Sequence, residues 1–233
     1  MARNAADIPS GNTGGMQKDL LTTDGYPARL VGIVFTGVQN QRPYQGVPKD
    51  PVDEVRLTYE LSHEFMKDEE GEILADKPRW LTETVPFKSL KLDKAKFTKR
   101  YNAIDPSNAG KGVIKNCLSN PVTVLIVNNP GKGKHEGKVF ENIGDVSLPP
   151  KKLPGYVQPP MVNPPFYYDL NDGDCTLEDF RKQPEFVQEI IMGANDFSTS
   201  LLAGLLGAET GKPVSSTPRE APEESTGDEE NPY

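Results

Sequence analysis

Residues 26–38 read YPARLVGIVFTGV, and this stretch decides the predicted fold. Apolar side chains fall on both faces of the run, which is typical of a long and largely buried strand. Gly32 and Gly37 interrupt it. A glycine inside a strand often marks a bulge or a sharp bend, and a small barrel needs such bends in order to close. We therefore predict a strongly curved first strand.

Four more strands and one helix are expected downstream of it. Residues 54–61 and 79–87 alternate between apolar and polar side chains, which indicates half-buried strands. Residues 121–127 are apolar on both faces, which favours a central strand, and residues 139–148 supply the fifth. A basic helix is expected over residues 93–101. This order is typical of a five-stranded OB-fold barrel, with a helix between its third and fourth strands.

The fold class is therefore predicted as mainly β, an OB barrel followed by C-terminal helices. A capping box at Thr176 and Asp179 predicts the start of one of these helices. A second is expected after Pro184, with one apolar face formed by Phe186, Val187, Ile190 and Ile191.

The chain divides into four predicted parts. Residues 1–25 form a flexible N-terminal arm, and residues 26–153 form the OB-fold domain that would bind DNA. Residues 154–207 are a Pro-rich connector with helices that pack on the barrel. Residues 208–233 lack hydrophobic periodicity and are expected to be a disordered acidic tail.

Composition excludes several classes of protein. No apolar run approaches the roughly 20 residues that a membrane helix requires, and the N-terminus does not read as a secretory signal. Cys117 and Cys175 are too few for a disulfide framework, so a reducing compartment is expected. The net charge of −8 also argues against nucleic acid, provided that the charge is evenly spread.

The charge is unevenly spread. Residues 88–153 hold 13 basic and 5 acidic residues, a net charge of +8, whereas residues 154–233 carry a net charge of −11. A basic centre followed by an acidic end is a pattern typical of nucleic-acid binding with an acidic tail. The acidic total therefore does not exclude DNA as a partner.

Enzyme and metal motifs are incomplete. Residues 207–213 are one residue short of a phosphate-binding loop. An acidic run that begins at Asp169 lacks the glycine and the glutamate that a calcium loop needs at its sixth and twelfth positions. His63 and His135 lie far apart, and neither has a cysteine nearby, so a zinc site is not expected. We predict a protein that is not an enzyme and that has no cofactor or metal.

The DNA-binding surface is predicted on the outer face of the second and third strands, with the loops that flank it. Repeated cations are needed for phosphates, and exposed aromatic rings are needed for unstacked bases. Trp80 and Tyr44 would stack on bases, with packing of Trp80 beneath the connector as the alternative. Phosphates would be contacted by six basic residues, Arg42, Arg56, Arg79, Lys132, Lys134 and Lys138. Phe97, although it lies among lysines, is expected to face the core, and Tyr101 could share either the basic face or the core.

The acidic tail is predicted to be regulatory. A flexible polyanion can occupy a basic groove in place of DNA, and an aromatic end lets it dock on a partner protein. The residues expected to do this are Glu220, Glu223, Glu224, Asp228, Glu229, Glu230 and the terminal Tyr233.

The first strand, from Tyr26 to Val34 and on through Gly37-Val38-Gln39, resembles that of bacteriophage single-stranded DNA-binding proteins. The layout of residues 26–233 is similar to theirs, with one OB fold and an acidic, aromatic-ended tail. The resemblance implies binding to single-stranded DNA without sequence preference during phage replication and recombination, in the cytoplasm of a bacterial host. It also implies a tail that competes with DNA and recruits replication proteins.

Alternatives remain for the ligand and for the class of protein. The connector and the C-terminal helices depart from the family layout, so duplex DNA stands as a second possible ligand, and a homo-oligomer is compatible with the sequence. The rival prediction is a structural protein of a virion that uses its β-barrel for assembly and has no affinity for DNA. A nuclease subunit is a weaker rival, because it would need a carboxylate cluster for magnesium that the spacing does not supply.

Overall fold

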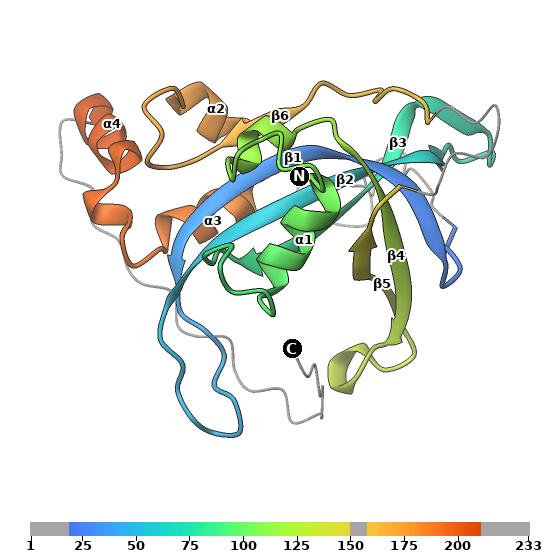
Figure 1. Ribbon diagram of the computed structural model, residues 1–233, viewed down its shortest axis with the longest axis horizontal. Coiled ribbons are helices and arrows are strands. Elements are labelled where there is room, and N and C mark those ends of the chain that lie inside the picture. Colours follow the sequence, from blue (N-terminus) through green and yellow to red (C-terminus); the bar gives the residue numbers. More distant parts are fainter. Residues whose placement is uncertain (1–18, 150–157, 211–233) are drawn as a thin grey trace, which may run out of the picture.

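The protein is described by a computed structural model over residues 19–149 and 158–210, and it is mainly β (Figure 1). Five antiparallel strands form a sheet in the order β3-β2-β1-β4-β5, curled into a half-barrel. The strands are β1 (Gly25–Gln39), β2 (Val52–Lys67), β3 (Ile73–Pro86), β4 (Pro121–Pro130) and β5 (Val139–Ser147). The predicted succession of elements along the chain, three strands, a helix and two strands, is confirmed. β2 and β3 are longer than the predicted strands, residues 54–61 and 79–87. The extra residues lack an alternating apolar pattern, but they pair with each other as far as Lys67 and Ile73.

Helices and short turns complete the structure. Helix α1 (Lys96–Ile104) lies between β3 and β4 as predicted, and it contacts β3, β4 and β5. The short strand β6 (Phe166–Tyr168) pairs in parallel with β1. The remaining helices gather at the opposite side of the sheet from β4 and β5 in Figure 1, and they are α2 (Leu177–Arg181), α3 (Glu185–Met192) and α4 (Leu201–Thr210). The 3-10 turns are η2 (Ile114–Cys117), η3 (Gly133–His135) and η4 (Phe197–Thr199).

Strand β1 bends at the two glycines that the sequence singles out. The register between β1 and β2 shifts at Gly32 and again at Gly37. Gly37 has a φ of +77°, which glycine adopts without strain, and a Cβ there would lie 2.8 Å from that of Ala194. The bends let the first part of β1 pair with β4 and leave its later part for β6.

One hydrophobic core extends through the sheet and the C-terminal helices. Leu30, Leu57 and Ile126 are fully buried inside the curl of the sheet. Phe97 of α1 is 1% exposed, which confirms that it faces the core, and Tyr101 is buried beside it at 2%. The same cluster continues into the C-terminal helices through Phe180, Val187, Ile191 and Phe197. The C-terminal helices therefore pack on the sheet.

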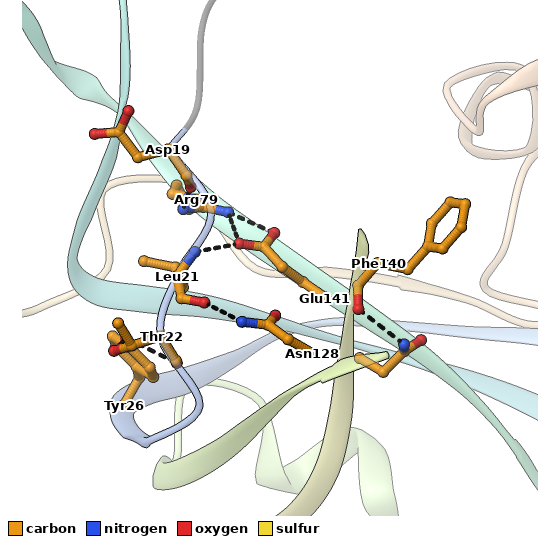
Figure 2. A network of polar contacts seen from close by, with 9 residues as sticks. Asp19, Leu21, Thr22, Tyr26, Arg79, Asn128, Phe140 and Glu141 are labelled. Carbon is orange, nitrogen blue, oxygen red and sulfur yellow. Dashed lines mark hydrogen bonds and ion pairs between the residues drawn. The ribbon is translucent and has the colours of Figure 1, made fainter. Parts of the chain in front are cut away.

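Side chains join the two edge strands of the sheet, β3 and β5. Arg79 of β3 donates to both carboxylate oxygens of Glu141 of β5, at 2.7 and 2.6 Å (Figure 2). The two side chains are only 4% and 3% exposed. Arg79 also donates to the carbonyl of Asp19 at 2.6 Å, and Glu141 accepts from the backbone of Leu21 at 2.7 Å. This buried pair therefore holds β3, β5 and the N-terminal segment together.

A second link across the same edges runs through α1. The buried Arg100 donates to Glu83 of β3 at 2.8 Å and forms an ion pair with Asp145 of β5. Tyr59 donates its hydroxyl to Glu83 at 3.2 Å. Burial acts to lower the pKa of Arg100, but the Glu83 carboxylate raises it above its ordinary value, so this cation stays charged.

Two predicted boundaries are wrong. The predicted flexible arm includes residues 19–25, yet Leu21 is buried in the core and its carbonyl accepts from Asn128 at 2.7 Å. A single buried leucine beside the exposed Leu20 produces no periodicity, so the pattern could not show it. The predicted tail includes residues 208–210, which lie in α4. The rest of the predicted arm and tail, residues 1–18 and 211–233, lies outside the described residues.

Replacing Glu141 with alanine should strongly destabilise the fold. The change leaves the guanidinium of Arg79 buried without its carboxylate, and loss of one partner of a buried pair costs about 3–5 kcal/mol. Urea unfolding of Glu141→Ala measures the free energy of unfolding. The control is Lys67→Ala, which breaks the partly exposed pair with Asp19 and should cost under about 1 kcal/mol. Equal losses in the two variants would contradict the role given to Glu141.

Candidate nucleic-acid interface

The outer face of β2 and β3 carries the first part of the candidate site. Trp80, Thr82 and Thr84 project from β3 away from the core, as the alternation predicts, whereas Glu83 and Val85 are buried on the other side. Because β2 and β3 pair in regular register along this stretch, their outward side chains form one continuous surface.

An aromatic groove of about 710 Å³ lies between this face and the C-terminal segment. Its strand side is formed by Arg56 and Trp80. Its other side is formed by Phe166 at the start of β6, Lys182 after α2 and Phe186 in α3. With Tyr167, four aromatic residues and two cations from distant parts of the chain thus line one groove.

Trp80 is held in a fixed orientation but keeps 43% of its surface exposed. Its ring lies 5.8 Å from that of Phe166, at an interplanar angle of 31°. Phe166 in turn sits over Gly32 of β1, where a Cβ would come within 2.0 Å of the Phe166 ring. The missing side chain at Gly32 therefore makes room for the ring that supports Trp80. Phe166 therefore packs against the indole, which stays accessible from the groove.

Glu60 fixes this arrangement from β2. Glu60 lies directly opposite Trp80 in the pairing of β2 with β3, and it is only 3% exposed. Its carboxylate accepts a hydrogen bond from the indole Nε1 of Trp80 at 3.2 Å. The same carboxylate accepts from the backbone of Val162 at 2.6 Å, and from the backbone and side chain of Asn163 at 3.2 and 2.8 Å. A buried carboxylate with four donors is well satisfied, so it ties the connector and the indole to the same point of the sheet.

Arg56 is the cation on the strand side of the aromatic groove. It is half-buried, donates to the hydroxyl of Thr84 at 3.3 Å, and lies 5.3 Å from the ring centroid of Phe186. Burial lowers the pKa of Arg56, and Glu54 acts against that effect. In the described part of the chain, no ion pair joins Arg56 to a carboxylate.

A second, basic groove of about 1260 Å³ begins where the aromatic groove ends. It lies between the β1–β2 loop, the far end of the β2–β3 face and the segment before α1. Thr84 lines it, and Thr84 is the residue to which Arg56 of the aromatic groove donates, so the two grooves adjoin. Asp50 and Glu54 are its acidic residues, against five cations, Arg42, Lys49, Lys88, Lys94 and Lys96.

The predicted site residues are only partly brought together. Arg56 and Trp80 share the aromatic groove, and Arg42 lines the basic groove. Tyr44 is 57% exposed in the β1–β2 loop, beneath the ammonium of Lys49 at 4.9 Å, and it lines neither groove.

The β4–β5 hairpin carries the three predicted lysines. Lys132 and Lys138 are exposed there and lie outside both grooves. The side chain of Lys134 falls outside the described part of the structure.

Arg79 is not on the outer face, where it was predicted to contact phosphate. Successive side chains in a strand point to opposite sides, so Arg79 faces inward while Trp80 faces outward. Its guanidinium is buried against Glu141. The prediction that Arg79 lies beside Trp80 in the site is therefore wrong.

The sequence pattern did not predict the C-terminal wall of the aromatic groove. Phe186 was expected on the buried face of its helix with Val187 and Ile191; those two are buried, but Phe186 is 53% exposed. Phe166 and Lys182 had no motif to mark them. The groove lysines Lys88, Lys94 and Lys96 were recognisable only as members of the basic centre, since their position depends on how the segment before α1 folds back along the sheet.

Within residues 19–149 and 158–210, no three His, Cys, Asp or Glu side chains are grouped so that they could hold a metal ion. Of the helices described in those ranges, none is long and apolar enough to cross a membrane. Comparisons of the chain with protein-family models, curated proteins and solved structures found no match.

Proposed function

We propose that this chain is a single-stranded DNA-binding protein without catalytic activity, built on an OB fold. The strand order, the helix between β3 and β4 and the joined edges of β3 and β5 support that fold. The observation that carries the function is the continuous path along the outer face of β2 and β3. It runs from Trp80, through Arg56 and Thr84, into the groove lined by five cations.

The chemistry of the path suits an unpaired strand. Cations spaced along a groove attract successive phosphates, and an exposed ring offers a stacking surface to any base. Trp80 would stack on a base, and Arg56 and Arg42 would contact phosphates. Both kinds of contact are independent of base identity, so binding would be non-sequence-specific. The protein would protect single strands during phage replication and recombination in the bacterial host.

The loops beside the path would extend it. Tyr44 in the β1–β2 loop would add a second stacking ring, and Lys132, Lys134 and Lys138 in the β4–β5 hairpin would add phosphate contacts. The acidic tail, residues 211–233, would compete with DNA for the basic groove and recruit replication proteins.

Charge reversal in the basic groove should weaken DNA binding. Lys88→Glu combined with Lys94→Glu replaces two exposed groove cations, and we expect at least a tenfold loss of affinity for an oligothymidylate. The slope of log affinity against log salt should become shallower by about 0.7 for each phosphate that the variant no longer neutralises. Fluorescence anisotropy over a range of salt concentrations measures both quantities.

The matched control is Lys77→Glu combined with Lys111→Glu, two exposed lysines that line neither groove and give the same change in net charge. An equal loss of affinity in this control would show a general charge effect rather than a groove. If the unaltered protein bound neither single-stranded nor duplex DNA, the proposal would fail and the virion-assembly alternative would gain.

Deleting residues 213–233 should tighten DNA binding, because the deletion removes six acidic residues and only one basic residue. The gain should be largest at low salt, where a charged competitor is attracted most strongly to the groove. Anisotropy titrations of the full chain and the truncated chain measure the difference. Unchanged or weaker binding by the truncated chain would show that the tail does not compete with DNA, while leaving the role of the groove intact.

A further inference from the structure

The aromatic groove has a composition that the basic groove lacks. Aromatic side chains line it from the sheet, from β6 and from α3, and one side of it belongs to the C-terminal helices. We infer that it is a nucleotide pocket, in which an unpaired base stacks against Trp80 and Phe186 while the adjoining phosphate binds Arg56. This inference rests on the proposed function and deepens it, since it gives the C-terminal helices a share in the binding site.

The rings of the groove are exposed and held in place before any ligand binds. Phe186 is 53% exposed although its neighbour Val187 is 2% exposed, so the ring packs on the groove side and not in the core. Trp80 is 43% exposed and is held by Glu60 and Phe166. Burying such rings against the face of a base removes apolar area from water, and it needs no reorganisation of the indole.

The two cations of the groove differ in how they are neutralised. Lys182 pairs with Glu178 at 3.0 Å and with Asp179 at 3.6 Å. Arg56 is half-buried and contacts the Thr84 hydroxyl and the Phe186 ring, with no carboxylate paired to it in the described residues. A partly desolvated guanidinium without a carboxylate is favourably neutralised by an anion. Phosphate suits it, because the guanidinium can form two parallel hydrogen bonds to phosphate oxygens.

The polar groups that line the groove indicate which feature of the base is recognised. The side chain of Asn163 donates to Glu60 at 2.8 Å, and that of Gln183 donates to the carbonyl of Asp179 at 3.1 Å. The hydroxyls of Thr58 and Thr82 bond to each other at 2.9 Å. Each of these groups already uses a donor within the protein, so the exposed ring faces are the contact that the groove offers most directly to a base. It would accept any base, provided that the base is unpaired.

The test compares a thymidine oligonucleotide with an abasic oligonucleotide of the same length and charge. The unaltered protein should bind the base-bearing strand at least tenfold more tightly, since stacking of one base on an aromatic ring is worth about that factor. Phe186→Ala should lose about tenfold in affinity for the thymidine strand and little for the abasic strand. Arg56→Gln should weaken binding of both strands.

The control is Leu201→Ala, because Leu201 in α4 is exposed to the same degree, at 52%, and lies outside the groove. It should bind both strands as the unaltered protein does. Phe186 is largely exposed, so its replacement leaves the core intact, and urea unfolding should give the same midpoint for both variants.

The outcomes separate the two proposals. If the unaltered protein bound the abasic strand as tightly as the thymidine strand, or if Phe186→Ala kept the full preference, the nucleotide pocket would be overturned and the phosphate-binding groove would stand. If the unaltered protein bound neither strand, the proposed function would fail together with the pocket.

Discussion

The ion pair between Arg79 and Glu141 connects the two edges of the curled sheet, and the candidate site depends on it. Both side chains are buried, and the pair also fixes the N-terminal segment through Asp19 and Leu21. Side chains alternate along a strand, so an inward Arg79 requires that the next residue, Trp80, faces outward. The contact that joins the sheet edges therefore also sets the position of the ring on which the proposed DNA path begins.

The C-terminal segment converts an open strand face into a groove. Glu60 holds the end of the connector and the indole at one point, and the absence of a side chain at Gly32 admits the ring of Phe166 beside them. α3 then presents Phe186 to Arg56 across the groove. Contacts made far apart in the sequence thus produce a site whose two sides come from the sheet and from the helices. A change that loosens the connector from the sheet would consequently also change the shape of the groove.

The order of the elements was predictable from the sequence because each strand and helix carries a local pattern. Residue spacing alone predicted three features of the structure. These are the bend at Gly32 and Gly37, the core position of Phe97 and the outward position of Trp80. The site was less predictable, because its residues act through long-range contacts. The sequence around Arg79 indicates an exposed cation, because its ion-pair partner Glu141 lies in the distant strand β5. Phe186 fits the apolar stripe of α3 but lies at the margin of that stripe, where packing against the sheet decides its exposure.

Trp80 is the only tryptophan in the chain, so its fluorescence reports on the aromatic groove alone. The most direct test is a titration of the protein with an oligothymidylate, followed at the tryptophan emission maximum. Stacking of a base on the indole should quench the emission in a saturable way, with a midpoint that moves to higher DNA concentration as salt increases. Unchanged emission, while anisotropy of the labelled strand showed that the DNA was bound, would contradict a binding path that begins at Trp80.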